Sequence, residues 1–209
     1  MKQAIDAIKL AVRSVMRGLA IGLDKISAGK ITPNSITWFG FLMHVPIACL
    51  IACGYLVWAG VLLVIFGLFD TLDGELARYQ KRVTNGGGFL DASTDRFKEV
   101  LLYTGSAYFF TTIGRPTYAA IAVAACGASL SVSYVKAKGE AVVATLGKKL
   151  AYTDLNRMFS GGLFPFEVRM LVFIVGLFAA RLYWAVAIIA VLSAAAALQR
   201  LFVISKVLR

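Results

Sequence analysis

Four aspartates stand close together in two short segments of an otherwise strongly apolar chain: Asp70 and Asp73, then Asp91 and Asp95. If both segments are helical, spacings of three and four residues place each pair on one face of its helix. We expect the two helices to meet around the glycine-rich link at 85–88 and to direct all four carboxylates at one point. Carboxylates so close together repel one another, and a bound divalent cation removes that repulsion. The spacing therefore predicts a metal site.

The pattern Asp-x2-Asp-Gly-x2-Ala-Arg-x8-Gly-x3-Asp-x3-Asp resembles the signature of the CDP-alcohol phosphatidyltransferases. Every fixed position is filled, by Asp70, Asp73, Gly74, Ala77, Arg78, Gly87, Asp91 and Asp95. The resemblance implies an enzyme that exchanges the CMP of a CDP-linked lipid for an alcohol, giving a phosphodiester and CMP. The alternative, in which the carboxylates are ordinary surface residues at helix ends, does not explain a match at every position.

The resemblance also implies roles for the carboxylates. Asp70, Asp73 and Asp91 are expected to bind Mg²⁺, or Mn²⁺ in its place, because both ions prefer oxygen ligands and can hold a diphosphate. Asp95 is expected to bind a second ion or to act as the catalytic base that takes the proton of the incoming hydroxyl. Both roles stay open for Asp95, since residue type does not separate them.

The segment Thr32-Pro33-Asn34-Ser35-Ile36-Thr37 is similar to the family's Thr-Pro-Asn/Asp-x-x-Thr element, whose polar residues line the nucleotide pocket. Asn34 and Thr37 are therefore candidates for contact with cytidine. The same residues also carry the signals of a helix start, so plain capping is the alternative explanation.

The remaining motif residues suit a nucleotide diphosphate. Gly74 and Ala77 lack bulk and would let the nucleotide approach, although small residues also permit close helix packing. Arg78 supplies a fixed cation for phosphate, or extends its charge to the membrane interface. Gly87 is expected to give the link its tight turn.

The segment at 133–140 and the Gln-Arg pair near the C-terminus look like those of the family's inositol-phosphate-using members. The candidates for binding an acceptor phosphate are Ser133, Lys136, Arg169 and Arg200. The tendency of basic residues to lie at cytosolic helix ends explains the cations equally well. Phe166 stands where inositol-phosphate members carry an arginine, which weakens inositol phosphate relative to glycerol phosphate.

With 209 residues, of which 59% are hydrophobic, and a mean hydropathy of +0.77, the chain is too apolar for an ordinary soluble domain. The net charge of +11 comes from residues beside the apolar runs and not from a basic stripe with interleaved aromatics. An anionic membrane surface is thus expected as a partner, and nucleic acid is not. The three cysteines lie in apolar runs, so no disulfide framework is expected.

The hydropathy pattern predicts an all-α membrane protein, with residues 1–30 as an amphipathic juxtamembrane segment and 31–209 as one membrane domain. The amphipathic helix is expected at 2–19. Six transmembrane helices follow: two between 35 and 79 with a break near Gly54-Tyr55 or Ala59-Gly60, then 89–113, 117–135, 165–180 and 182–199. A polar connection is expected at 139–164.

Charge placement predicts the orientation of these helices. Only Arg115 and Arg181 fall on the side opposite both termini, so the termini and the aspartates are expected at the cytosolic face of a prokaryotic cell membrane. By resemblance, the chain is expected to form a homodimer.

The expected reaction transfers a phosphatidyl or archaetidyl group from CDP-diacylglycerol or CDP-archaeol to a phosphorylated polyol, inositol phosphate first. The alternative enzyme is a phosphatidylglycerophosphate synthase that uses glycerol 3-phosphate. A third hypothesis is a divalent-cation transporter, because acids inside membranes often mark ion paths. Against it, the aspartates gather at one interface, and no acidic entry stands at the other.

Overall fold

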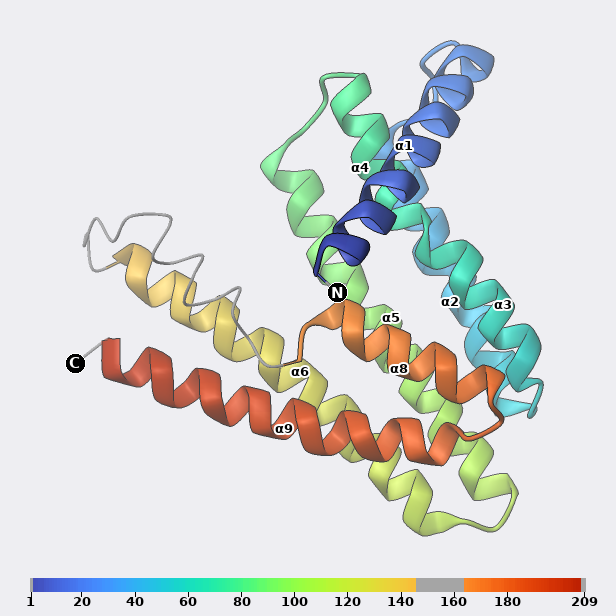
Figure 1. Cartoon of the computed structure of the whole chain (residues 1–209), viewed down its shortest axis with the longest axis vertical. Coiled ribbons are helices and arrows are strands. Elements are labelled where there is room, and N and C mark those ends of the chain that lie inside the picture. The colour runs from blue at the N-terminus through green and yellow to red at the C-terminus, as the bar shows by residue number, and fades with distance from the viewer. Residues whose placement is uncertain (1, 146–163, 208–209) are drawn as a thin grey trace. The chain divides into compact units, whose positions relative to one another are not determined.

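The computed structural model describes residues 2–145 and 164–207, with side chains for 10–145 and 164–206. All regular elements in these ranges are α-helices (Figure 1). Their order is α1 (Lys2–Ser27), α2 (Pro33–Ala52), α3 (Leu56–Gly67), α4 (Phe69–Tyr79), α5 (Asn85–Thr112), α6 (Pro116–Thr145), α8 (Phe166–Phe178) and α9 (Leu182–Val207). The all-helical prediction is confirmed for this part of the chain, and most of the predicted polar connection lies outside it.

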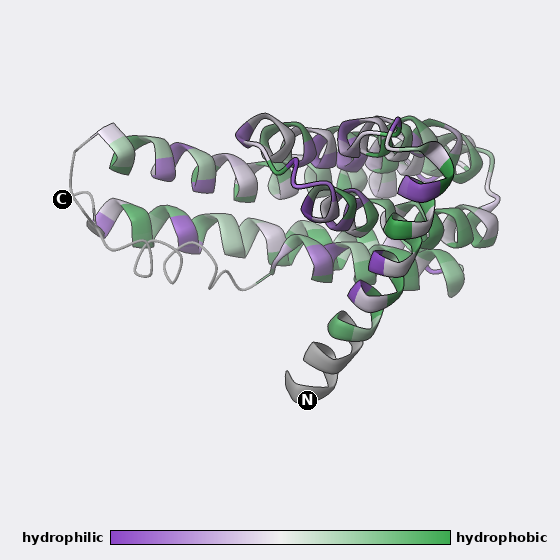
Figure 2. Cartoon of the chain, turned by 90° about the horizontal axis from the view of Figure 1, so that it is seen from above, coloured by the Kyte–Doolittle hydropathy of each residue, from purple (hydrophilic) through white to green (hydrophobic). Residues whose placement is uncertain are grey.

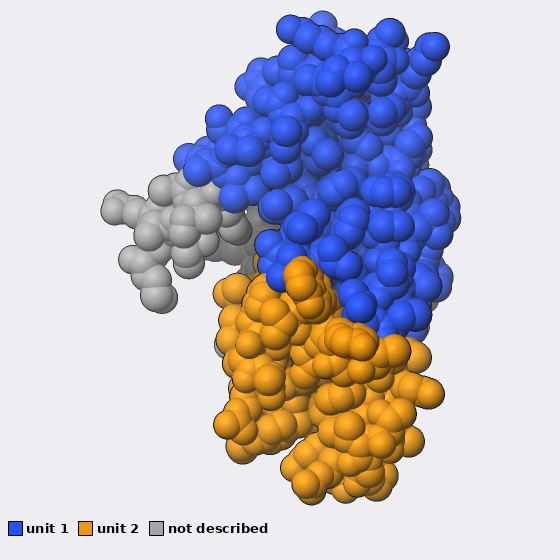
Figure 3. All heavy atoms as spheres, turned by 90° about the vertical axis from the view of Figure 1, so that its right-hand side faces the viewer, with its two compact units in different colours: residues 1–50, 61–102 blue, residues 51–60, 103–209 orange. Residues whose placement is uncertain are grey.

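The chain divides into two compact units (Figure 3). Unit 1 comprises Met1–Leu50 and Val61–Leu102, and it holds α1, α4 and the first half of α5. Unit 2 comprises Ile51–Gly60 and Tyr103–Arg209, and it holds α6, α8 and α9. All four aspartates of the motif belong to unit 1.

In unit 1, α1 packs against α4. The contact is apolar: Ala20, Ile36 and Leu76 are buried together, with partly buried hydrophobic residues around them. Beside it, Gln80 Nε2 donates hydrogen bonds to Asp24 Oδ1 (2.6 Å) and to the Ile31 carbonyl oxygen (3.0 Å). The end of α4 is thus fixed to the end of α1 and to the segment that precedes α2.

The start of α2 follows its sequence signals. Pro33 is the first helical residue, where its missing N–H costs nothing, and Thr32 Oγ1 accepts a hydrogen bond from the Ser35 N–H (3.2 Å). The helix ends at Ala52, and Gly54 has a φ of +82°, so the break lies at the first of the two predicted places.

The link between α4 and α5 differs from the prediction, which put its tight turn at Gly87. The turn lies at Lys81, which has a φ of +55°. There the Arg82 N–H donates to the Ala77 carbonyl (2.8 Å) and the Lys81 N–H to the Arg78 carbonyl (3.2 Å), as in a Schellman motif.

Gly87 instead lies in the first turn of α5, which begins at Asn85 and not near 89. Thr84 caps this helix, because its Oγ1 accepts the Gly87 N–H (3.0 Å). A capped first turn offsets the low helix propensity of three consecutive glycines, which explains why the helix includes the glycine run and starts just before it.

In unit 2, α9 packs against both α6 and α8. A Cβ at Gly176 would overlap Ala185, so the absence of a side chain lets α8 and α9 approach closely. The turn before α6 contains Gly114 at a φ of +70°, as the Gly-Arg-Pro sequence predicts. Both long helices run further than predicted, α6 to Thr145 and α9 to Val207.

Four helical segments in the described residues are long and apolar enough to cross a membrane: Pro33–Ala52, Leu56–Tyr79, Pro116–Thr145 and Leu182–Lys206. Hydrophobic residues lie on successive turns of most helices (Figure 2). Many are exposed, such as Trp38 and Leu42 on α2, as expected for surfaces that meet lipid. The lengths of these helices and their exposed hydrophobic residues are those expected of a membrane protein.

Candidate functional site

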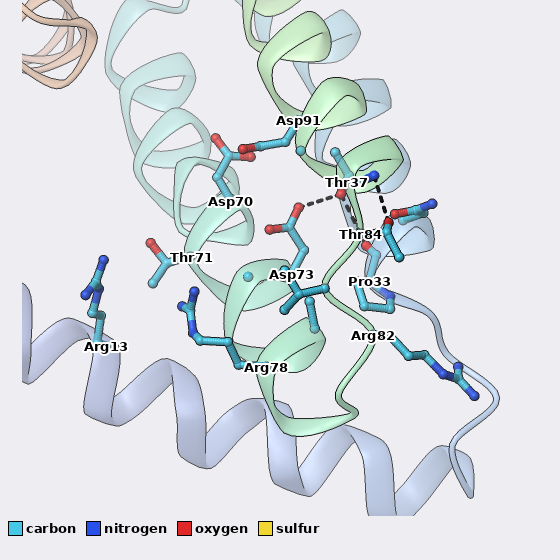
Figure 4. Close-up of a pocket in the computed structure, with 16 residues that line it drawn as sticks. Arg13, Pro33, Thr37, Asp70, Thr71, Asp73, Arg78, Arg82, Thr84 and Asp91 are labelled. Carbon is cyan, nitrogen blue, oxygen red and sulfur yellow. Dashed lines mark hydrogen bonds between the residues drawn. The ribbon is translucent and has the colours of Figure 1, made fainter. Parts of the chain in front are cut away.

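Three of the four motif aspartates converge. Asp70 comes from α4, and Asp91 and Asp95 lie one turn apart on α5. One carboxylate oxygen from each lies within 4.8 Å of the others, which is close enough for all three to hold one ion. Figure 4 shows Asp70 and Asp91 facing each other from the two helices. We call these three residues the carboxylate cluster.

Asp73 stands apart from the carboxylate cluster. It is 6% exposed, and its Oδ2 accepts a hydrogen bond of 2.5 Å from Thr37 Oγ1 on α2 (Figure 4). A charge-assisted bond of this length fixes both side chains and joins the start of α2 to α4. The sequence pattern names both residues but does not show that they contact each other.

A buried lysine enters the carboxylate cluster. Lys98 is 2% exposed, and its Nζ lies 2.5 Å from Asp70 Oδ1 and 3.1 Å from Asp95 Oδ1. Its ammonium lessens the repulsion between carboxylates that share a site away from water. Lys98 was not among the predicted site residues, although spacings of seven and three residues from Asp91 and Asp95 place it on their helix face.

The carboxylate cluster suits a hard divalent cation. Asp91 Oδ1 is buried and has no hydrogen-bond partner among the described residues. A buried oxygen of this kind needs a donor or an ion. The motif supplies carboxylate oxygens without sulfur or imidazole, and that donor set favours Mg²⁺ or Mn²⁺ over zinc.

A pocket of about 340 Å³ opens beside the carboxylate cluster, between α1, α2, α4 and the start of α5. It is lined by all six residues that the sequence assigned to the nucleotide: Asn34, Thr37, Gly74, Ala77, Arg78 and Gly87. Asp70, Asp73 and Asp91 line it as well. The pocket thus joins the predicted nucleotide residues to the metal-binding carboxylates.

The two glycines have different surroundings. A Cβ at Gly87 would lie 3.3 Å from Thr84 Oγ1 and 3.5 Å from Asn34 Oδ1, so the missing side chain lets these polar groups sit against α5. A Cβ at Gly74 would meet only the guanidinium of Arg78, at 3.5 Å. Gly74 and Ala77 therefore leave a shallow face of α4 open to the pocket.

Arginines line the same pocket from three elements: Arg13 of α1, Arg78 of α4 and Arg82 of the link (Figure 4). Arg78 Nη2 also donates to Glu75 Oε1 (2.6 Å), while its side chain stays 54% exposed. Carboxylates and guanidinium groups in one pocket suit a ligand that carries both a metal-binding diphosphate and further anionic oxygens. Arg13 and Arg82 were not among the predicted site residues.

The predicted acceptor residues all lie in unit 2. Arg169 on α8 is 1% exposed, donates from Nη1 to the Phe164 carbonyl (3.1 Å) and has its guanidinium 5.8 Å from the centre of the Phe166 ring. Arg200 on α9 donates from Nη1 to the Val132 carbonyl of α6 (3.1 Å).

The other two acceptor candidates lie on α6. Ser133 is half-buried, and Lys136 Nζ lies 3.8 Å from Glu140 Oε1 one turn later. Arg200 of α9 donates to the carbonyl oxygen of Val132, the residue before Ser133, so α9 contacts α6 beside Ser133.

The family model of the CDP-alcohol phosphatidyltransferases matches residues 30–197. Curated relatives include phosphatidylinositol phosphate synthases from Cutibacterium acnes (35% identical, covering 57% of this chain and 58% of the relative) and Corynebacterium glutamicum (35% identical, covering 71% and 63%). The chain thus spans about three fifths of the length of these relatives.

Solved structures of Mycobacterium tuberculosis phosphatidylinositol phosphate synthase share the fold. The one with CDP-DAG bound gives a TM-score of 0.77 at 24% identity, covering 91% of this chain and 94% of the other. The one in complex with manganese and citrate also gives 0.77, at 25% identity, covering 91% and 89%.

Proposed function

The chain belongs to the CDP-alcohol phosphatidyltransferase family, and from this premise we propose that it transfers a phosphatidyl group from a CDP-linked lipid to inositol phosphate, releasing CMP. The observation that carries the proposal is the pocket in which all six predicted nucleotide residues meet the carboxylate cluster. CDP-diacylglycerol is the proposed donor, and CDP-archaeol is the ether-lipid alternative. Family membership and this pocket favour an enzyme over a cation transporter.

The residues proposed to hold the metal ion are Asp70, Asp91 and Asp95, with Asp73 included by family resemblance. Mg²⁺ or Mn²⁺, when bound there, would screen the diphosphate and stabilise the charge that develops on its oxygens. The unpartnered Asp91 Oδ1 and the all-oxygen donor set support this assignment.

The chain's own residues then orient the donor. Asn34 and Thr37, near the start of α2, are proposed to contact cytidine. Gly74 and Ala77 let the nucleotide lie against α4, and Arg78 binds a phosphate oxygen. Because these groups come from several helices packed together in unit 1, they hold the nucleotide without large rearrangement, which is what positioning catalysis requires.

Asp95 is proposed as the general base. It takes the proton of the acceptor hydroxyl, whose oxygen forms a bond to the lipid-bearing phosphorus. The bond from that phosphorus to the bridging oxygen breaks, and CMP leaves with the electron pair. The products are a phosphodiester and CMP, so atoms and charge balance.

Inositol phosphate is proposed as the acceptor because relatives at 35% identity are named phosphatidylinositol phosphate synthases. Ser133, Lys136, Arg169 and Arg200 are proposed to bind its phosphate. Phe166 supports the second candidate, glycerol 3-phosphate, since its ring lies against Arg169 where inositol-phosphate members carry another cation.

We further propose six membrane spans, with α5 and α8 added to the four segments that length and composition identify. α1 would lie on the cytosolic surface of the cell membrane, and the chain would form a homodimer. On α1, Met16 and Ala20 are buried, while Val15, Leu19 and Ile26 on the adjoining side are exposed, as expected if lipid covers them.

The test measures CMP release by the purified full chain with CDP-diacylglycerol and Mg²⁺. Inositol 1-phosphate, glycerol 3-phosphate, free inositol and serine are compared as acceptors. Release with inositol phosphate alone is the expected result. Release with glycerol phosphate alone would replace the acceptor but keep the mechanism, and no release with these acceptors from either CDP-diacylglycerol or CDP-archaeol would overturn the proposed function.

A further inference from the structure

We propose that Lys98 permanently fills one cation position of the carboxylate cluster, so that without nucleotide the cluster takes one divalent ion and not two. The inference rests on the proposed function only in assigning a metal ion to these aspartates. It concerns a residue outside the family motif, and it fixes the number of ions that the motif leaves open.

The contacts of Lys98 are those of a bound cation. Its Nζ lies between two carboxylates from different helices, 2.5 Å from Asp70 Oδ1 on α4 and 3.1 Å from Asp95 Oδ1 on α5. The side chain is 2% exposed, so water screens these contacts little. An ammonium is a compact point charge, and it can stand where a small ion would otherwise bridge the two oxygens.

The remaining position faces Asp91. Its Oδ1 is buried and has no hydrogen-bond partner in the part of the chain that the structure describes. Because one carboxylate oxygen of Asp91 lies within 4.8 Å of oxygens from Asp70 and Asp95, an ion bound by Asp91 can share them. Lys98 therefore leaves room for one ion at the cluster and blocks a second between Asp70 and Asp95.

The balance of charge in the carboxylate cluster also favours one divalent ion. Within the carboxylate cluster, Asp70, Asp91 and Asp95 carry three negative charges, which one divalent ion and the Lys98 ammonium balance. Of the charged groups nearby, Arg96 is paired with Glu99 (2.7 Å), and Asp73 lies outside the cluster, where Thr37 donates to it. A second divalent ion would leave an excess of positive charge in a place poorly reached by water, where unbalanced charge is costly. If Lys98 is replaced by a neutral residue, two carboxylates lose their counter-charge, and a second divalent ion becomes favourable.

The experiment titrates Mn²⁺ into the purified full chain in detergent, without nucleotide, and follows free Mn²⁺ by electron paramagnetic resonance. The wild type is expected to bind one ion per chain and Lys98→Met two. Lys98→Arg, which keeps a cation, is expected to bind one. Lys25→Met is the matched control, because Lys25 is exposed on α1, and it should bind one ion like the wild type.

Two ions or none in the wild type would overturn the inference without any variant. One ion in a folded Lys98→Met chain would also overturn it, since Lys98 would then be only a structural ion pair. If Lys98→Met does not fold, Lys98→Gln replaces it, and the wild-type count still decides against two ions. Failure of the proposed function would appear separately, as absent CMP release beside the expected ion counts.

Discussion

Asp95 lies among groups of opposite charge, and this setting shapes what its substitution should do. Its Oδ1 accepts from Lys98 (3.1 Å), and its Oδ2 lies 3.8 Å from Arg96 Nη2. Asparagine keeps the size of the side chain and an oxygen that can accept from Lys98. The substitution therefore removes the basic carboxylate while disturbing the surrounding contacts little.

For Asp95→Asn we expect the loss of turnover with largely intact nucleotide binding. Removing a general base typically costs about 10² to 10⁴ in rate. The measurements are CMP release and equilibrium binding of the CDP-linked lipid. Turnover at the wild-type rate would exclude Asp95 as the base, whereas loss of both turnover and binding would indicate a role in holding the donor.

Gly87 and Gly86 offer a matched pair at the pocket. Both lie in the first turn of α5, but a Cβ at Gly86 meets no atom within 4 Å, whereas one at Gly87 comes within 3.3 Å of Thr84 and 3.5 Å of Asn34. Alanine at either position favours the helix, by up to about 1 kcal/mol. Only at Gly87 must a pocket residue, Thr84, move.

We predict that Gly87→Ala weakens donor binding and that Gly86→Ala does not. Displacing Thr84, which caps α5 and lines the pocket, should cost about 1 kcal/mol or more, equivalent to about fivefold or more in KM for the CDP-linked lipid. The readouts are KM and the midpoint of thermal unfolding. Equal KM values for the two variants would show that donor binding does not depend on the position of Thr84.

At the scale of elements, the sequence predicted most helices and misplaced some of their ends. The start of α2 and the break at Gly54 follow from Pro33, Asn34 and a single glycine with positive φ, all local signals. The start of α5 could not be found this way, because glycines suggest a turn and only the hydrogen bond from Gly87 N–H to Thr84 reveals the cap. The turn at Lys81 could not be predicted either, because lysine rarely adopts the positive φ that it has there.

In the candidate site, too, features that depend on local sequence could be predicted and contacts between helices could not. Spacing within each helix predicted which aspartates share a face, and resemblance to the family supplied the six residues expected at the nucleotide, which line one pocket in the structure. Contacts between helices depend on packing that no spacing encodes. The bond from Thr37 to Asp73 and the approach of Lys98 to Asp70 are of this kind, and so is the position of Arg13 at the pocket.

The docking of α1 on α4 depends on Gln80, which bonds Asp24 and the Ile31 carbonyl. Gln80→Ala removes the donor of both part-buried hydrogen bonds, at a cost of about 0.5–1.5 kcal/mol for each bond. We expect faster amide exchange along α1 and a raised KM for the donor, because Arg13 lines the pocket only while α1 stays docked.

Gln199→Ala is the control for this change, because Gln199 is exposed on α9 in unit 2. It should leave exchange in α1 and KM unchanged. If Gln80→Ala also left exchange in α1 unchanged, the apolar contact of Ala20 and Leu76 alone would hold α1 in place.

For the whole molecule, composition predicted a membrane protein because apolar runs are the strongest signal in the chain. The hydropathy pattern predicts ends at 135 and 199 for the helices that are α6 and α9, because charged residues follow both positions. In the structure α6 and α9 continue through these residues. A helix needs apolar residues only where it meets the hydrocarbon core, and beyond that depth its backbone hydrogen bonds are made just as well by polar sequence.

An arrangement with six spans and one with four spans place Arg115 and Lys138 on opposite sides of the membrane. If α5 and α8 cross as well as the four apolar segments, Arg115 lies outside the cell and Lys138 inside. If only the four segments cross and the N-terminus is cytosolic, Arg115 lies inside and Lys138 outside. Arg181 lies outside in both cases, and Lys30 inside, so these two report orientation alone.

Single cysteines at these four positions, in a chain whose natural cysteines are replaced by alanine, can be labelled in whole cells with a membrane-impermeant maleimide. We expect Arg115→Cys and Arg181→Cys to react in intact cells, and Lys138→Cys and Lys30→Cys only after permeabilisation. The reason is that charge near short loops sets orientation, and of the basic residues only Arg115 and Arg181 lie in the three turns assigned to the outside, between α2 and α3, α5 and α6, and α8 and α9. Labelling of Lys138→Cys but not Arg115→Cys in intact cells would establish four spans, and α5 would then carry Asp91 and Asp95 along the membrane surface.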